Sequence, residues 1–155
     1  MIPLVCWVEI AALPTVVGTR PRRALAGGAS AKHNGNIAIF EYIDDLGNRI
    51  IKEFSTITQK DWRELGYLRN PHAERLGLDW LAKNNIKLSR VISVYSELEP
   101  CSFILHKCKM LLEKSLPMAK IEFSYKYSGI FGDNLQVARK ASIEERIKDL
   151  NELIP

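Results

Sequence analysis

Hydrophobic and polar positions along the chain follow patterns that predict two strands and then an alternation of helices and strands. Residues 36–44 and 49–55 are rich in β-branched and aromatic residues, and Asp45–Asn48 between them supplies turn-forming side chains. Together these stretches predict a β-hairpin. Arg90–Tyr95 is a short β-branched run of the kind that is buried in a parallel sheet, and residues 119–127 alternate as a fourth strand should.

Helical patterns separate these strands. The first helix is expected over residues 71–84, because Pro71 is tolerated in a first helical turn and the apolar residues that follow lie on one broad side. A second is expected over residues 107–115. A third, amphipathic one covers residues 142–153, where Ser142 and Glu145 have capping-box spacing. The order predicts an α/β fold, a three-layer α/β/α arrangement with a central mixed sheet of about five strands and helices on both faces.

Residues 1–35 differ from the rest of the chain. Glycine and proline interrupt this segment, which predicts a linker-like region ahead of a folded domain over residues 36–155. Residues 1–17 are apolar, but Glu9 interrupts them and no basic stretch precedes them, unlike a signal peptide. No segment reaches the roughly 18 apolar residues of a membrane span. We therefore expect a soluble protein with no membrane partner.

Composition narrows the class of protein. With 155 residues, 46% of them hydrophobic, the chain can bury one core without disulfide bonds, and its 26% charged residues argue against disorder. The net charge of +4 is compatible with a polyanionic partner. Three cysteines at uneven spacing do not suggest a disulfide scaffold, and use as metal ligands explains them better.

A group of metal-ligating residues lies at two predicted helix starts. His72 and Glu74 begin the first helix, whereas Cys101 and Cys108 lie at the start of the second. In α/β folds, ligands collect where helices begin beside the carboxyl ends of strands. Catalytic zinc usually takes three protein ligands and leaves a fourth position for water. Each residue alone is ordinary, His72 as a capping residue and the cysteines as buried thiols, but their joint spacing favours a metal site.

The spacing of the two cysteines needs a break in the helix. On a continuous helix, residues seven positions apart are about 10.5 Å apart along the axis, whereas two thiolates on one zinc ion are only roughly 4 Å apart. Residues 102–106 are therefore predicted to loop outward, with the regular helix starting close to Cys108. His106 is an alternative third ligand.

These residues resemble a known family. An H-x-E motif followed by P-C-x-x-C is typical of zinc deaminases, and here the two cysteines are further apart. The sequence YSELEPC at Tyr95–Cys101 and the segment AKIEFSYKYSG over residues 119–129 resemble the deaminase domains of bacterial polymorphic toxins, in the cytidine deaminase-like superfamily. The resemblance covers residues 36–129.

The resemblance implies a function and the residues that perform it. It implies a zinc-dependent hydrolytic deaminase that converts cytosine to uracil in a nucleic acid, with conversion of adenine to hypoxanthine as the alternative. His72, Cys101 and Cys108 would hold Zn²⁺, and Glu74 would transfer protons. We assign substrate binding to Asn36, Ala73, Ser96 and Glu97.

The resemblance also implies a biological setting. The domain would be the toxin part of a larger secreted effector, delivered from a producing bacterium into the cytoplasm of a target cell, and a cognate immunity protein would neutralise it. Two alternatives remain open. One is a deaminase of free nucleosides or nucleotides. The other is a non-catalytic structural zinc module that binds a partner, although such zinc normally has four protein ligands and only three are in register here.

Overall fold

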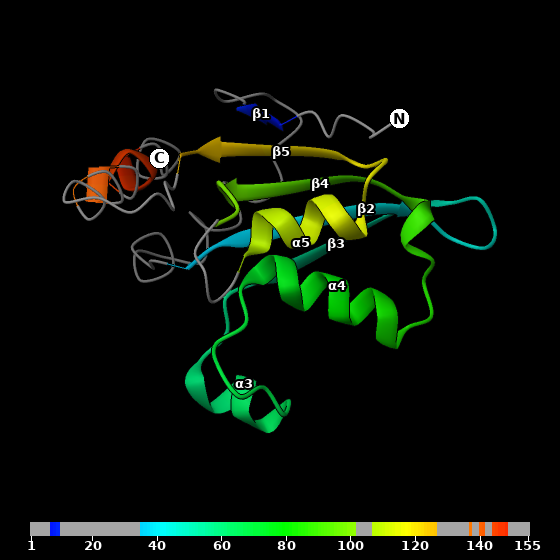
Figure 1. Ribbon diagram of the computed structural model, residues 1–155, viewed down its shortest axis with the longest axis horizontal. Coiled ribbons are helices and arrows are strands. Elements are labelled where there is room, and N and C mark those ends of the chain that lie inside the picture. Colours follow the sequence, from blue (N-terminus) through cyan, green and yellow to red (C-terminus); the bar gives the residue numbers. More distant parts are fainter. Residues whose placement is uncertain are drawn as a thin grey trace, which may run out of the picture.

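The computed structural model describes residues 35–101 and 107–126, positions 137, 140–141 and 144–148, and the backbone of residues 7–9. In this part of the chain a mixed β-sheet is covered by helices that pack on it and on each other (Figure 1). The strands are β1 (Trp7–Glu9), β2 (Ile37–Ile43), β3 (Arg49–Ser55), β4 (Val91–Leu98) and β5 (Lys120–Tyr125).

The strands lie in the order β1-β5-β4-β2-β3. Strand β2 is antiparallel to β3 and to β4, whereas β5 is parallel to β4 and to β1. The predicted α/β class with a mixed sheet is therefore confirmed. The count of about five strands rests on β1, of which only three backbone positions are described, so that count and the three-layer arrangement stay predictions.

The predicted hairpin is formed by β2 and β3, with Ile43 opposite Arg49 at its closed end. Asp44 organises the turn, because its Oδ1 accepts hydrogen bonds from the backbone N–H groups of Leu46 and Asn48, at 2.9 and 2.8 Å. Gly47 has a φ of +84°, in the left-handed region where glycine has no Cβ penalty. The turn predicted at residues 45–48 is thus present, with Asp44 as an additional turn residue, and it sets the register of β2 and β3.

Helices α4 (Ala73–Lys83) and α5 (Cys108–Ser115) begin and end close to the predicted positions. Helix α4 packs against β2 and β3 and also against α5. Apolar side chains between these helices and the sheet form the core, where Phe40 lies edge-on to Phe54 with ring centroids 5.7 Å apart. The core residues include Ala38, Phe40, Leu78, Leu81, Val91, Val94, Leu112, Leu116 and Ile121. The core holds the first turns of α4 and α5 near the carboxyl end of β4 (Figure 1).

A short helix, α3 (Gln59–Glu64), lies in the segment that showed no regular pattern in the sequence. None of its residues is buried, so it has no apolar face that a hydrophobic period could reveal. Its N-terminal signal was present, since Thr58 caps it by accepting a hydrogen bond from the backbone N–H of Asp61. A single 3₁₀ turn, η2 (Leu88–Arg90), leads into β4.

The two ends of the chain are described only in part. Strand β1 comes from the linker-like segment 1–35 and pairs with β5, so at least three residues of that segment add to the sheet. Of the predicted helix over residues 142–153, positions 144–148 are helical, whereas Ser142 lies outside the described residues. Among the helices of the described residues, none has the length and apolar character needed to cross a membrane.

Candidate metal centre and catalytic pocket

His72 lies at the N-cap of α4, where its backbone is extended and its side chain makes no capping hydrogen bond. The imidazole turns instead toward two cysteines. Its Nδ1 atom lies 3.3 Å from Sγ of Cys101 and 3.3 Å from Sγ of Cys108. The three ligand atoms all lie within 4.8 Å of one another. The structure therefore brings together the three residues that the sequence predicted as metal ligands.

The two cysteines reach this position from different elements. Cys101 follows the end of β4, and α5 begins at Cys108, as predicted from the distance argument. The backbone N–H of Lys109, in the first turn of α5, donates a hydrogen bond to the carbonyl oxygen of Cys101 at 3.0 Å. This bond ties the two ligand segments together. The predicted outward loop at residues 102–106 and the alternative ligand His106 lie outside the described residues.

The donor set fits a zinc ion. Tetrahedral zinc with bonds of about 2.3 Å to sulfur and about 2.05 Å to nitrogen places its nitrogen and sulfur ligands roughly 3.6 Å apart, close to the observed separations. In the thiol pair, a hydrogen bond between the two sulfurs lowers the pKa of Cys101 and raises the pKa of Cys108. A dication would be bound by both as thiolates, with release of protons.

Glu74 lies in the first turn of α4 with only 2% of its surface exposed. Its two oxygens have different surroundings. Oε1 accepts hydrogen bonds from Nδ2 of Asn36 and from Oγ of Ser96, both at 3.0 Å. Oε2 is buried and has no hydrogen-bond partner among the described residues. Burial is the main cause that raises the pKa of Glu74 above its ordinary value, as for other carboxyls that exchange protons in active sites.

Asn36, just before β2, connects the site to two strands. Its Nδ2 also donates to Oγ of Ser96 at 2.7 Å, and its Oδ1 accepts from the backbone N–H of Leu98 at 2.9 Å. The hydroxyl of Ser96 donates in turn to Glu74 or to the carbonyl oxygen of Leu98. This network, formed by Asn36, Glu74, Ser96 and Leu98 and named here the Asn36 network, holds the carboxylate in one orientation.

A cavity of about 160 Å³ opens on this network and on the metal ligands. It is smaller than the roughly 300–1,000 Å³ of pockets for drug-sized ligands, so it has room for a small planar group rather than for a whole nucleotide. Its lining is part polar and part apolar and consists of Gly35, Asn36, Thr56, Asn70, His72, Glu74, Leu98, Glu99 and Cys101. A hydrolytic centre needs these parts: a three-ligand metal site, a buried proton carrier and a recess beside them.

Comparison with known families decides the assignment. A family model described as Xanthomonas-like deaminase matches residues 33–149, which is more than half of the chain. The chain belongs to this deaminase family. None of the curated proteins compared matches the chain. Membership of this family supports a hydrolytic deaminase activity. The group formed by His72, Cys101 and Cys108 could hold the metal that such enzymes commonly use.

Of the four residues assigned to substrate binding, only Asn36 lines the 160 Å³ cavity, whereas Ala73, Ser96 and Glu97 do not. Ala73 is fully buried in the hydrophobic core, and Glu97 is buried and faces Arg146. Asn36 lines the cavity, and Ser96 reaches it through its hydrogen bonds. Sequence reasoning missed Thr56 and Asn70. Their positions, directly after a strand and directly before Pro71, were the available signals.

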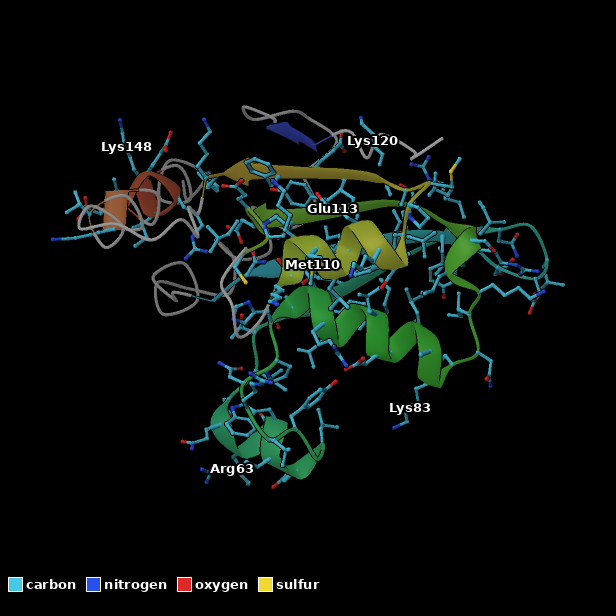
Figure 2. All side chains as sticks on the ribbon, viewed as in Figure 1. Arg63, Lys83, Met110, Glu113, Lys120 and Lys148 are labelled. Carbon is cyan, nitrogen blue, oxygen red and sulfur yellow. The ribbon has the colours of Figure 1, made fainter. Side chains whose placement is uncertain are left out.

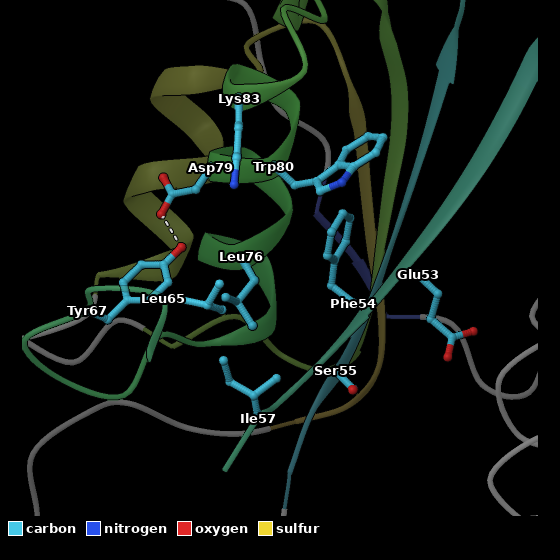
Figure 3. A pocket seen from close by; sticks show the side chains of 10 residues that line it. All are labelled: Glu53, Phe54, Ser55, Ile57, Leu65, Tyr67, Leu76, Asp79, Trp80 and Lys83. Carbon is cyan, nitrogen blue, oxygen red and sulfur yellow. Dashed lines mark hydrogen bonds between the residues drawn. The ribbon is translucent and has the colours of Figure 1, made fainter. Parts of the chain in front are cut away.

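Two further cavities lie nearby. One of about 290 Å³ borders the metal ligands His72 and Cys108 and is otherwise lined by residues 66–71 and Arg75. The other, of about 380 Å³, lies between β3 and α4 and contains no metal ligand (Figure 3). There Tyr67 donates a hydrogen bond to Asp79 at 2.8 Å, and burial raises the pKa of Tyr67 to about 12. The 290 Å³ cavity is the one positioned to extend a substrate site.

Proposed function

We propose that this deaminase uses zinc and converts cytosine to uracil in a nucleic acid. The observation that supports the chemistry most directly is the asymmetry of Glu74. One oxygen is fixed by two hydrogen bonds, and the other is buried without a partner among the described residues, in a residue that lines the same cavity as His72 and Cys101. A buried polar atom left unpaired is costly, and proton transfer explains why it is kept.

The reaction adds water at the ring carbon that carries the amine and releases ammonia. When bound by His72, Cys101 and Cys108, zinc would supply a water acidic enough to react near neutral pH. Two protons must then move, one to the ring nitrogen and one to the departing amine. Glu74 is the candidate carrier for both, through Oε2, while Asn36 and Ser96 hold its other oxygen still. Asn36 and Thr56 in the cavity wall would orient the base.

The 290 Å³ cavity favours a nucleic-acid strand over a free nucleoside as the substrate. The 290 Å³ cavity shares Asn70 and His72 with the 160 Å³ cavity, so the two adjoin around the metal site. Its lining includes Arg69 and Arg75. Nε of Arg75 pairs with the carboxylate of Asp79 at 3.0 Å, and Asp79 is not among the lining residues. A nucleotide next to the target base could lie there with its phosphate near these guanidinium groups, whereas a free nucleoside would leave the cavity empty. Phosphate contacts of this kind supply most of the sequence-independent affinity for nucleic acid.

The biological setting is proposed from the resemblance of Tyr95–Cys101 to polymorphic-toxin deaminases. The chain would be the toxin domain of a larger secreted effector, soluble, delivered by a bacterium and active in the cytoplasm of the target cell. An immunity protein that covers the 160 Å³ cavity would be its natural inhibitor.

The first test compares the wild type with Glu74→Ala on a cytosine-containing oligonucleotide, the matching RNA, an adenine-containing oligonucleotide and free cytidine. We expect uracil only from cytosine in a strand, and a loss of about 10²-fold or more in kcat for Glu74→Ala with one zinc ion per chain in both proteins. Activity that survives in Glu74→Ala would contradict the mechanism. Zinc without activity on any substrate would favour a structural module, and faster turnover of free cytidine would favour a nucleoside deaminase.

The second test asks whether the 290 Å³ cavity binds a nucleic-acid strand. Arg69→Gln should raise KM for the oligonucleotide several-fold and lower the slope of its affinity against salt by about one phosphate contact, while kcat on the oligonucleotide stays nearly unchanged. Arg63→Gln is the matched control, because Arg63 lies on α3, away from the sheet, and does not line the 290 Å³ cavity (Figure 2). Equal effects of the two substitutions would show that general charge, not this cavity, attracts the strand.

A further inference from the structure

Arg146 is buried completely, with 0% of its side chain exposed, although it belongs to the C-terminal helical segment 144–148. Its Nη1 donates a hydrogen bond to the carbonyl oxygen of Gly35 at 2.7 Å, across 111 positions of sequence. Its Nε lies 3.9 Å from Oε1 of Glu97, whose side chain is 1% exposed. A charged pair buried to this degree is rare in proteins. The guanidinium group has a hydrogen bond to the Gly35 carbonyl, whereas its contact with Glu97 is an ion pair at 3.9 Å without a hydrogen bond.

Both contacts of Arg146 adjoin the Asn36 network. Gly35 is the residue before Asn36, and Glu97 lies between Ser96 and Leu98 on β4. Successive side chains of a strand point to opposite faces. Since Ser96 faces Glu74 on α4, Glu97 faces the other side of the sheet, where Arg146 meets it. Arg146 thus holds, from the opposite face, the two chain segments whose near face carries the network.

We infer that Arg146 is a positioning residue for Glu74 and acts through the Asn36 network. The hydrogen bond from Arg146 to the Gly35 carbonyl fixes the backbone just before β2, and so it fixes the position of the Asn36 side-chain amide. The contact of Arg146 with the Glu97 side chain fixes the position of β4 relative to the C-terminal segment. It thereby fixes Ser96 Oγ and the backbone N–H of Leu98, which both form hydrogen bonds with the Asn36 side chain. Both partners of Glu74 Oε1 therefore depend on one guanidinium group. The C-terminal segment, shown beside the carboxyl ends of β4 and β5 in Figure 1, becomes part of the catalytic apparatus.

A guanidinium group suits this task better than other side chains. Its planar fork can donate to a carbonyl on one side while it faces a carboxylate on the other, and it stays charged at every pH that proteins tolerate. A lysine at this position would keep the charge but could not maintain both contacts with one fixed geometry. Lys148, two residues further along, is exposed and points outward, so it offers a matched control on the same segment (Figure 2).

The inference rests on the proposed deaminase function, and its test separates the two. Arg146→Met should lower kcat about ten-fold or more, since small displacements of reacting groups are costly, with KM nearly unchanged and one zinc ion retained. Arg146→Lys should recover part of kcat, and Lys148→Met should match the wild type. A readout independent of activity is the NMR signal of the Asn36 side-chain amide, assigned by its absence in Asn36→Asp. It should shift in Arg146→Met and not in Lys148→Met.

A purely structural role predicts a different pattern. Replacing both members of a buried ion pair by apolar residues often restores stability, so Glu97→Leu combined with Arg146→Met should fold more stably than Arg146→Met alone. We expect kcat to stay low in this double variant. Recovery of wild-type kcat together with stability would overturn the inference, as would an unchanged Asn36 signal in Arg146→Met. If the wild type deaminates no substrate, the proposed function fails, and the NMR comparison still decides whether Arg146 positions the network.

Discussion

At the scale of single residues, the site depends on two kinds of side chain. For some, the residue type alone indicates the chemistry, and for others it does not. His72, Glu74, Cys101 and Cys108 could be predicted because zinc ligation and proton transfer allow few residue types. Arg146 could not, because its partners Gly35 and Glu97 are distant in the sequence and an arginine in an amphipathic segment is ordinarily exposed. Because Arg146 is buried between Gly35 and Glu97, it can position the Asn36 network, which an exposed arginine could not do.

Glu41 provides a prediction at this scale. The side-chain hydrogen bond from Arg49 on β3 is the main cause that lowers the pKa of Glu41, and Ser93 on β4 contributes a second bond at 3.1 Å. A carboxyl with a lowered pKa stabilises the fold above its unfolded pKa of 4.5, and the contribution is lost as pH falls through the lower folded value. Arg49 is 69% exposed. Glu41→Gln should therefore cost at most about 1 kcal/mol at pH 7.

Urea unfolding at pH 7 and at pH 3 measures this difference between Glu41→Gln and the wild type. The difference in the free energy of unfolding between the two proteins should be smaller at pH 3 than at pH 7. Glu145→Gln, at an exposed position of the helical segment 144–148, is the control for a general change in net charge. A gap that widens at pH 3 would contradict the assigned ion pair.

At the scale of elements, apolar patterns located β2, β3, β4, β5, α4 and α5 among the described residues, whereas β1 lies in the segment predicted as a linker. Helix α4 and strand β2 were predicted within a few residues because each buries a continuous stripe or an alternating set of side chains. Helix α3 was missed for the same reason, since it buries nothing. The start of α5 at Cys108 followed from a different constraint, the short distance that a shared metal imposes on two sulfurs.

Gly77 in α4 tests how closely this helix packs on β2. A Cβ at position 77 would overlap the ring of Phe40, which is 0% exposed and cannot swing away. Alanine would gain about 1 kcal/mol of helix propensity, but overpacking a rigid core costs about 1–3 kcal/mol, so the overlap should win. We expect Gly77→Ala to lower the free energy of unfolding by up to about 2 kcal/mol in urea titrations.

The partner substitution makes the cause of this loss visible. Phe40→Leu removes part of the ring that the added methyl group would strike, so Gly77→Ala should cost less in a Phe40→Leu background than in the wild type. Strictly additive effects, or a Gly77→Ala variant more stable than the wild type, would mean that α4 moves away from β2 at little cost.

At the scale of the whole molecule, the metal ligands connect elements that are far apart in the sequence. His72 precedes α4, Cys101 follows β4 and Cys108 begins α5, so one ion would join two helices and the central part of the sheet. An unfolded chain does not present such a site, and the binding free energy therefore stabilises the fold. Metal removal should act on global stability as well as on catalysis.

Thermal unfolding with and without a chelator measures this coupling. A metal at a thousand times its Kd adds about 4 kcal/mol, which corresponds to a rise in Tm on the order of 10 °C for a chain of this size. The thiols of Cys101 and Cys108 and the ring of His72 must lose protons to bind, so the Tm difference should be larger at pH 8 than at pH 6. Cys108→Ser lacks one ligand and should respond little to the chelator. If it responds as strongly as the wild type, the stabilising metal is bound elsewhere, and the three-ligand centre would not be what joins α4, β4 and α5.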